Sequence, residues 1–181
     1  MKHSILFTGL MIDAKERRYA RFPVSKEKMV RKEIQKRLIM LKEKFPAVSG
    51  IAGGACGGDI IFHELCMEMN IHSEIYLALP FNEFKNQSVS FAGTNWDDRF
   101  DNLTGQLPVH ILPISSGTEK NVWELANEWM LKVALQHGGE PITLIALWDG
   151  KAGDGGGGTE HMVKIAKNKK ATVEIIDINK L

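Results

Sequence analysis

Cysteine is scarce in this chain, with Cys56 and Cys66 the only two among 181 residues. Two cysteines cannot build the disulfide framework that supports small secreted domains. Methionine, which oxidising surroundings damage, is present eight times. Both counts indicate a reducing compartment, and we expect a cytoplasmic protein.

Excess charge and long apolar runs are also missing. The net charge is +1 at pH 7, so nothing favours broad attraction to nucleic acid or to an anionic membrane surface. The longest apolar runs, such as residues 142–148, are far too short to cross a bilayer. The first apolar stretch ends before Gly9, so we expect no signal peptide. A chain of this length and ordinary composition is expected to form one domain over residues 1–181.

Glycine, in contrast, is clustered, and residues 155–158 are consecutive glycines. An apolar run leads into this segment, and Thr159 and Glu160 open a helical pattern that leads out of it. Strand, glycine loop and helix in this order hold phosphate, because glycine lets backbone N–H groups approach an anion and the helix start adds unpaired donors. Thr159 is expected either to cap the helix or to donate its hydroxyl to a phosphate oxygen. The alternative, a flexible linker, is disfavoured because only one helix and one strand are predicted to follow.

Short continuous apolar runs alternate with segments of helical periodicity along the chain. Val30, Ile34 and Leu38 lie at helical spacing, and Ser25 is placed to cap that helix. Continuous apolar runs are typical of strands buried on both faces of a parallel sheet. The sequence therefore predicts an α/β protein of Rossmann-like, doubly wound architecture, with a mainly parallel sheet of about six strands and helices on both faces. The predicted strands are residues 5–8, 48–52, 74–79, 109–112, 142–148 and 173–178, and further helices are predicted after residue 59 and over 119–136 and 160–169.

Residues 81–105 follow neither pattern. They contain too many large apolar side chains, including Phe84, Trp96 and Phe100, for a disordered loop. We expect short helices in this segment, folded over an edge of the sheet or over a ligand.

Glycines follow the predicted strands at 5–8, 48–52 and 142–148. The carboxyl ends of parallel strands meet at one edge of a sheet, where ligands bind near the switch point in strand order. We therefore expect one cleft that accepts a phosphate, and we expect Gly157→Val to abolish ligand binding with little change in the unliganded melting temperature. The residues expected to line this cleft are Gly9, Gly54, Gly57, Gly157 and Thr159.

Charged side chains also fall at the predicted loop ends. Aspartates there bind ribose hydroxyls, hold Mg²⁺ against phosphates, or cap helices, and for Asp59 capping is the favoured role. Arg21 and Arg99 have the forked geometry that suits phosphate, although a single arginine is more often a surface charge. The six histidines show no metal-ligand spacing, so Mg²⁺ accompanying a nucleotide is the one cofactor we consider. The aspartates in question are Asp13, Asp59, Asp149 and Asp154.

Cys56 and two tryptophans allow more than one interpretation. A thiolate just before a helix is stabilised by the helix dipole, and His63 is the nearest candidate base, but a small residue filling a tight turn is the favoured interpretation of Cys56. Trp96 and Trp148 are suited to stacking on a base, although large aromatic residues are usually core.

The glycine turn after the second strand, together with the later run of glycines before Thr159 and Glu160, resembles the SLOG superfamily. This group of Rossmann-like domains includes the lysine-decarboxylase-like nucleotide phosphoribohydrolases and DNA-processing protein A, and the closer resemblance is to SLOG-like modules of bacterial signalling proteins. The resemblance implies a nucleotide ligand. The matching segments, spread over nearly the whole chain, are Met11-Ile12-Asp13, Arg21-Phe22-Pro23, Gly58-Asp59-Ile60, Leu79-Pro80-Phe81, Ser88-Val89, Arg99-Phe100, Trp148-Asp149-Gly150, Gly153-Asp154-Gly155 and Gly157-Gly158-Thr159.

This chain departs from the resembled pattern at three places. Leu10 stands where the closer relatives often have histidine, and Asp154 or Gly155 stands where the phosphoribohydrolases have proline. Met162 occupies the position of their catalytic glutamate, and Glu160 is adjacent to the threonine instead. A shift of two residues turns a side chain by about 200° around a helix. The hydrolase chemistry is therefore not inherited by position.

Three functions follow from these patterns. The first is a module that binds a nucleotide or a nucleotide-derived signal, with a signalling partner or a second copy of the chain as possible partners. The second is a nucleotide N-glycosidic hydrolase, with Glu160 or Asp149 as candidate catalytic carboxylates. The third, a single-stranded DNA binder, is disfavoured by the near-zero net charge. The residues expected to contact the ligand are Thr8, Gly9, Asp13, Arg21, Gly53, Gly54, Ala55, Gly57, Asp59, Pro80, Arg99, Asp149, Gly155, Gly156, Gly157, Gly158, Thr159 and Glu160.

Overall fold

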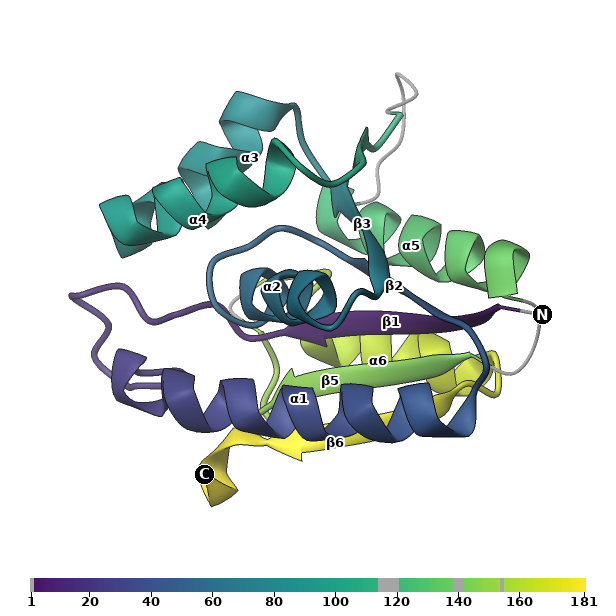
Figure 1. Ribbon diagram of the computed structural model, residues 1–181. Coiled ribbons are helices and arrows are strands. Elements are labelled where there is room, and N and C mark those ends of the chain that lie inside the picture. The colour runs from purple at the N-terminus through teal and green to yellow at the C-terminus, as the bar shows by residue number, and fades with distance from the viewer. Residues whose placement is uncertain (1, 114–120, 139–141, 154) are drawn as a thin grey trace.

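The computed structural model describes residues 2–113, 121–138, 142–153 and 155–181. Six parallel strands form one sheet in the order β4-β3-β2-β1-β5-β6 (Figure 1). The predicted α/β class, the parallel sheet and the strand number are confirmed. The strands are β1 (His3–Gly9), β2 (Val48–Ala52), β3 (His72–Leu77), β4 (Val109–Ile111), β5 (Thr143–Trp148) and β6 (Thr172–Asp177).

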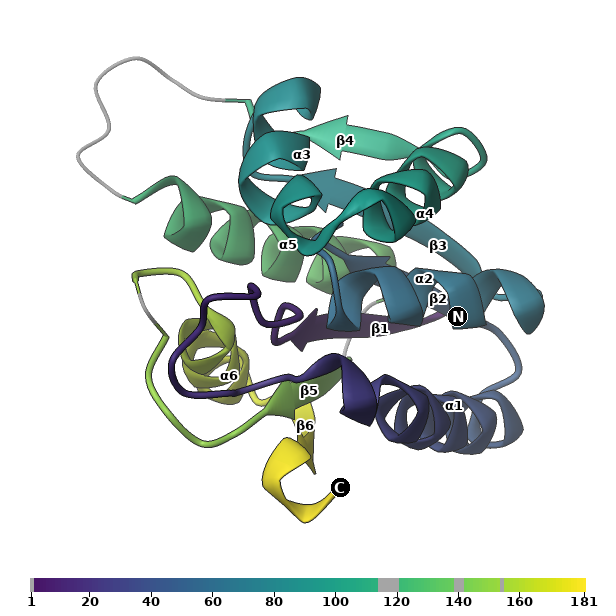
Figure 2. The same ribbon diagram turned by 90° about the vertical axis from the view of Figure 1, so that its left-hand side faces the viewer.

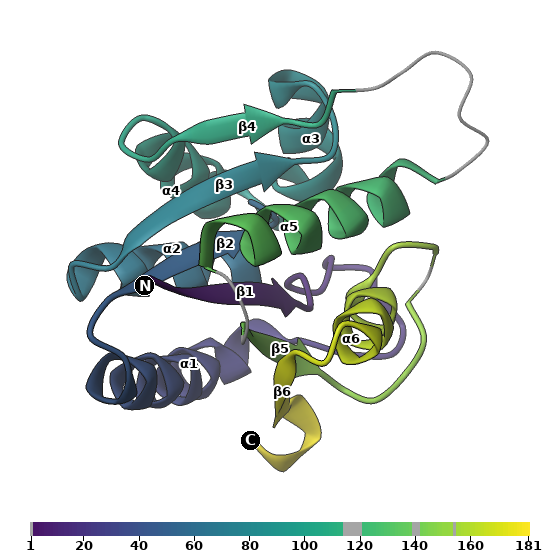
Figure 3. The ribbon, with the colours of Figure 1, turned by 90° about the vertical axis from the view of Figure 1, so that its right-hand side faces the viewer.

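Helices cover both faces of this sheet. The alternation of side chains along β1 assigns the faces: Ile5 and Phe7 belong to the core beneath α1 (Glu27–Lys44) and α2 (Gly58–Glu68), whereas Leu6 belongs to the core beneath α5 (Val122–Gly138) and α6 (Thr159–Asn168). Figure 3 shows α5 lying across β1 and its neighbours, with α6 beside β5. Both faces are apolar, which explains why the strands are continuous apolar runs.

The irregular segment between β3 and β4 is helical. It contains α3 (Phe81–Ser88), a 3₁₀ turn at Ser90–Ala92 and α4 (Thr94–Thr104). Trp96, Phe100 and Leu103 of α4 are buried, and α4 packs on α2. The expected short helices are therefore present, and α4 packs on the helix layer that covers one face of the sheet.

Some expected boundaries differ from the observed ones. Ser25 does not cap α1, because a 3₁₀ turn at Val24–Lys26 precedes the helix and Lys26 occupies its N-cap position without a side-chain hydrogen bond. β1 begins earlier than expected, since His3 pairs with Val48 and its ring contacts the Thr143 hydroxyl at 3.0 Å. The expected start of the helix at 119 lies outside the described residues, and the observed α5 begins at Val122.

The sheet order places the switch point between β1 and β5. From β1 the chain moves outward through β2, β3 and β4, and then returns to the other side of β1 for β5 and β6. The connections at the carboxyl ends of β1 and β5 therefore diverge to opposite faces and leave a crevice between them. Among the described residues, none of the helices is both long and apolar enough to span a membrane.

Candidate functional site

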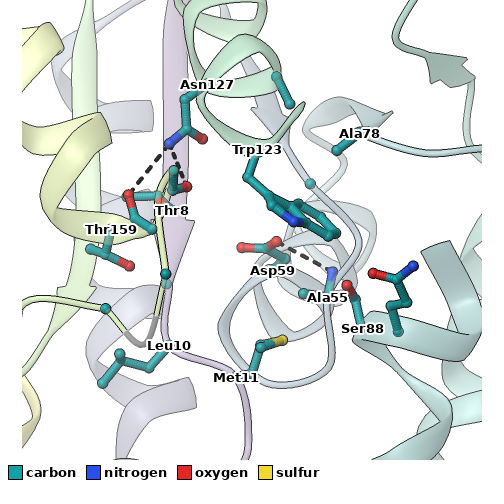
Figure 4. A pocket seen from close by; sticks show the side chains of 18 of the residues that line it. Thr8, Leu10, Met11, Ala55, Asp59, Ala78, Ser88, Trp123, Asn127 and Thr159 are labelled. Atoms are coloured by element: carbon teal, nitrogen blue, oxygen red, sulfur yellow. Dashed lines mark hydrogen bonds between the residues drawn. The ribbon is translucent and has the colours of Figure 1, made fainter. Parts of the chain in front are cut away.

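A cavity of about 580 Å³ opens at the carboxyl edge of the sheet, beside the switch point. Its walls come from the loops after β1, β2, β3 and β5 and from α3, α5 and α6 (Figure 4). Segments far apart in the sequence therefore meet here, as expected for loops that follow the carboxyl ends of parallel strands. The expected ligand-contact residues that line it are Thr8, Gly9, Asp13, Arg21, Gly53, Ala55, Asp59, Gly155, Gly156, Gly157, Gly158 and Thr159.

The glycine run forms one side of the cavity and is held against the start of α5. The side-chain amide of Asn127 donates to the carbonyl of Gly157 at 2.7 Å and to that of Gly158 at 3.3 Å. Gly157 has φ +79°, and an added Cβ would lie 2.4 Å from the backbone of Trp123. A side chain at Gly157 therefore has neither a suitable backbone conformation nor space, so the expectation that Gly157→Val leaves the unliganded protein intact is wrong.

The start of α6 faces the same cavity without a side-chain cap. Gly158 occupies the N-cap position and makes no side-chain hydrogen bond, so the expected capping role of Thr159 is wrong. Thr159 is instead the first residue of α6, and it is buried against the cavity. Uncapped N–H groups and the positive end of the helix dipole thus lie next to the glycine run, an arrangement that suits an anion.

The segment between β1 and α1 is fastened across the end of β5. The Asp13 carboxylate accepts hydrogen bonds from the backbone N–H groups of Arg21 and Phe22 at 2.9 Å. The Arg21 guanidinium forks onto Asp149, at 2.7 Å from Nε to Oδ2 and 2.8 Å from Nη2 to Oδ1. Figure 2 shows this segment, in purple, running from the end of β1 past α6 to the start of α1. The Arg21 fork is therefore occupied by a carboxylate, and the hydrogen bond from Arg21 holds the pKa of Asp149 below its ordinary value.

Asp59 is a carboxyl group that lines the cavity. It does not cap α2, because Gly57 is the N-cap residue and Asp59 lies in the first turn. Its Oδ2 accepts a hydrogen bond from the Ala55 N–H at 3.3 Å. Burial raises the pKa of Asp59 to about 7, and the Ala55 hydrogen bond only partly opposes this rise.

We expect Asp59→Asn to stabilise the unliganded protein at alkaline pH. The folded-state pKa near 7 lies above the unfolded value of about 4, so the folded state binds this proton more tightly. Ionisation of Asp59 therefore lowers the free energy of unfolding. This loss is absent below about pH 4 and complete above about pH 7. In urea unfolding at about pH 8, the free energy of unfolding of the variant should exceed that of the wild type by roughly 2–4 kcal/mol. Near about pH 4 the two proteins should have the same free energy of unfolding. An equal difference at both pH values would contradict this account.

Several expected contact residues lie away from the cavity. Arg99 donates to both carboxylate oxygens of Glu64 at 2.7 and 2.8 Å and to Glu27 at 2.7 Å, and it stacks on Trp96 at 3.9 Å. Burial lowers the pKa of Arg99, but its bonds to Glu64 and Glu27 outweigh this and raise it. Arg99 thus ties α4 to α1 and α2 and does not line the cavity.

Gly54, Gly57 and Pro80 serve the packing of the chain next to the cavity. An added Cβ at Gly54 would touch Phe100 at 3.0 Å, and one at Gly57 would touch the Ile12 nitrogen at 2.7 Å. Pro80 is the N-cap residue of α3. These residues shape the loops around the cavity but are not among its lining.

The two candidate catalytic carboxylates are not in the cavity lining either. Asp149 is engaged by Arg21, as described above. Glu160 is exposed and borders a shallow depression on the other side of the glycine run, next to His161 and Lys164. Asp154 lies outside the described residues.

Cys56 does not have the environment of a nucleophile. Its side chain is fully buried, and burial raises its pKa to about 12. The expected base, His63, is engaged at both ring nitrogens, by the Ser73 hydroxyl and the Gly53 carbonyl at 3.0 Å each. Burial lowers the pKa of His63 to about 4, so the ring is neutral. The thiolate hypothesis is therefore wrong, and both side chains belong to the packing around α2.

Aromatic side chains that the sequence did not single out as site residues line the part of the cavity that adjoins the contact between Gly157 and Trp123. Trp123 and Phe84 line it, with ring centroids 6.0 Å apart, and Tyr76 lines it from β3. Trp148 also lines it and donates its Nε1–H to the Lys151 carbonyl at 2.7 Å, whereas Trp96 is core. The one sequence signal for this wall is a polar residue, Asn127, within the apolar stripe of α5 (Figure 4).

Metal-ligating side chains do not gather in the described part of the chain: it holds no group of three or more histidine, cysteine, aspartate or glutamate residues placed to bind an ion. No family model matches the sequence, and no curated protein is significantly similar to it.

Proposed function

We propose that this protein is a module that binds a nucleotide or a nucleotide-derived signal. The observation that carries the proposal is the division of one cavity into two unlike sides. One side has the glycine run and the uncapped start of α6, and the adjoining side has the rings of Trp123 and Phe84. A nucleotide divides in the same way, into an anionic phosphate and a flat apolar base.

The phosphate would lie against the glycine run. Gly155, Gly156 and Gly158 leave the backbone accessible along this side, and the Thr159 hydroxyl lies beside it. Backbone N–H groups at a helix start attract an anion through both hydrogen bonds and the helix dipole. Arg21 is paired with Asp149, so in our proposal the phosphate is held by this backbone, with Arg17 and Lys151 as the other cations of the cavity lining.

The base would lie toward Trp123. Half-buried aromatic side chains give a heterocycle a flat surface to stack on, and such stacking is worth about 1–3 kcal/mol per base. The cavity volume of about 580 Å³ falls within the range of roughly 300–1,000 Å³ that small-molecule sites occupy. Size and surface chemistry thus support a ligand of nucleotide dimensions.

The hydrolase alternative has less support. A glycosidase needs a carboxylate close to the anomeric carbon, and both of its candidates, Glu160 and Asp149, lie outside the cavity lining. The single-strand DNA alternative requires a basic groove along the backbone of the nucleic acid, and the net charge of +1 does not favour one. The resemblance to SLOG-like signalling modules agrees with a binding function, with a partner protein or a second copy responding to the ligand.

Gly155→Val is the variant that tests the phosphate side. An added Cβ at Gly155 meets nothing within 4 Å, so the unliganded melting temperature should stay nearly unchanged while the valine fills space in the cavity. The wild type should gain about 2.7 kcal/mol of stability at a ligand concentration one hundred times the dissociation constant. The variant should gain none of it, as measured by thermal unfolding with nucleoside monophosphates and cyclic nucleotides.

Ala152→Val is the matched control, because Ala152 lies in the same loop but is exposed and does not line the cavity. It should retain the full ligand-induced shift. Retention of the shift by Gly155→Val would contradict the proposed phosphate position. Multiple-turnover release of free base, detected by chromatography, would replace the binding function with the hydrolase.

A further inference from the structure

Among the described residues, Asp59 differs from Asp13 and Asp149 in having an oxygen directed at the cavity. Asp13 is occupied by the backbone of Arg21 and Phe22, and Asp149 by the guanidinium of Arg21. The Oδ2 atom of Asp59 accepts one hydrogen bond, from the Ala55 N–H. Figure 4 shows its second oxygen turned toward the side of the cavity where Thr8 and Thr159 lie.

The position of this carboxyl group is fixed by the packing around it. Gly53 lies directly against it, because an added Cβ there would be 2.7 Å from Oδ2. The carbonyl of Gly53 is in turn held by His63. The carboxyl group therefore has one side against the backbone of the loop after β2 and the other side open, as expected of a group that orients a ligand.

Trp123 and Asp59 line the same cavity, together with Phe84. In Figure 4 the Trp123 ring and the Asp59 carboxyl group appear in the same part of this cavity. A planar heterocycle stacked on Trp123 with its edge toward Asp59 would bring the hydrogen-bond donors of that edge to the carboxyl group.

We propose that Asp59 selects the base, accepting N–H hydrogen bonds from a heterocycle with adjacent donors on its pairing edge, as guanine has. Guanine offers an N1–H and a 2-amino group side by side, whereas adenine places the N1 lone pair there, which a carboxylate oxygen repels. The inference rests on the proposed nucleotide function. It adds a ligand class, guanine nucleotides, and a residue that determines specificity.

The ionisation state of Asp59 then controls binding. Burial raises its pKa to about 7, and only the ionised carboxylate accepts from both donors. Three neighbouring groups titrate outside this range: burial raises the pKa of Cys56 to about 12, lowers the pKa of His63 to about 4, and raises the pKa of Tyr76 above its ordinary value. The remaining charged groups of the cavity lining are Asp13, Arg17, Arg21 and Lys151.

The test is to measure dissociation constants of GMP and AMP by calorimetry between about pH 5 and about pH 8. These ligands share their ribose and phosphate, so they differ only in the base. We expect GMP to bind at least about tenfold more tightly than AMP at pH 8, and this ratio of affinities to fall as the pH drops below about 7. The phosphate, whose second pKa is about 6, is shared by both ligands and cancels in the ratio. In Asp59→Asn the preference for GMP and the pH dependence of the ratio should both disappear.

Glu160→Gln is the control, since it removes one negative charge from an exposed position outside the cavity lining. It should keep the preference and the pH profile of the wild type. Equal binding of GMP and AMP by the wild type, or an affinity ratio with the same pH profile in Asp59→Asn, would overturn this inference and leave the nucleotide function standing. Failure of both ligands and of the cyclic nucleotides to bind at every pH would instead refute the nucleotide function.

Discussion

Replacing Arg21 by alanine is expected to lower the free energy of unfolding by about 3–5 kcal/mol. The side chain of Asp149 is only 2% exposed and that of Arg21 13%, and the two groups form a bidentate pair. The alanine variant leaves the carboxylate buried without its cation, which costs far more than breaking an exposed ion pair. Urea unfolding at neutral pH measures the difference.

The pH dependence identifies the cause of this loss. Arg21 depresses the folded-state pKa of Asp149, so the pair stabilises the protein above the unfolded value of about 4 and loses its effect as the pH falls through the folded value. The gap between wild type and Arg21→Ala should therefore narrow in acid. A gap independent of pH would assign the loss to packing of the arginine side chain instead.

Arg18→Ala is the matched control for the same loop. Arg18 is exposed, and its guanidinium lies over the exposed ring of Tyr19 at 5.3 Å from the centroid. We expect this variant to change the free energy of unfolding by less than about 0.5 kcal/mol. A loss as large as that of Arg21→Ala would show that the loop, and not the buried ion pair, responds to the change.

Gly157→Val is expected to destabilise the unliganded protein by about 2–5 kcal/mol. The valine must adopt φ near +79° with its Cβ 2.4 Å from the Trp123 backbone. Because the start of α5 cannot shift without moving Asn127, which binds the Gly157 carbonyl, the strain has little means of relief. Thermal and urea unfolding without ligand measure the loss.

Gly155→Val separates this effect from ligand binding, because its Cβ enters open space. Each valine variant should therefore differ from the wild type in one measurement. Gly157→Val should lower the unliganded stability, and Gly155→Val should abolish the stabilisation by ligand. If Gly157→Val unfolds at the same urea concentration as the wild type, the glycine run can move away from α5 and make room for the valine side chain.

Local patterns in the sequence were sufficient for the secondary structure and for one side of the cavity. Apolar runs such as the one before Asp149 became strands buried on both faces, because hydrophobic periodicity acts over a few residues and is visible without tertiary structure. The position of the glycine run follows from the same logic. A loop after a parallel strand must emerge at the carboxyl edge of the sheet, whichever strands are its neighbours.

The partners of individual side chains required the tertiary structure. Arg21 and Asp149 are 128 residues apart in sequence, and nothing local distinguishes an arginine that meets a carboxylate from one that meets a phosphate. Trp123 has the same helical spacing as core residues of α5, yet it lines the cavity because the helix begins beside the glycine run. Such pairings depend on how the layers pack.

The sequence by itself determined that this chain forms a parallel α/β sheet with glycine loops at its carboxyl edge, because those features depend on periodicity and on the backbone freedom of glycine. Only the tertiary structure decided that β5 lies next to β1, and that Asp59 turns one oxygen into the cavity while Glu160 stays outside its lining. The physical reason is that strand order, burial and the direction of a side chain are set by contacts between segments distant in sequence, and these contacts form only when the whole chain folds.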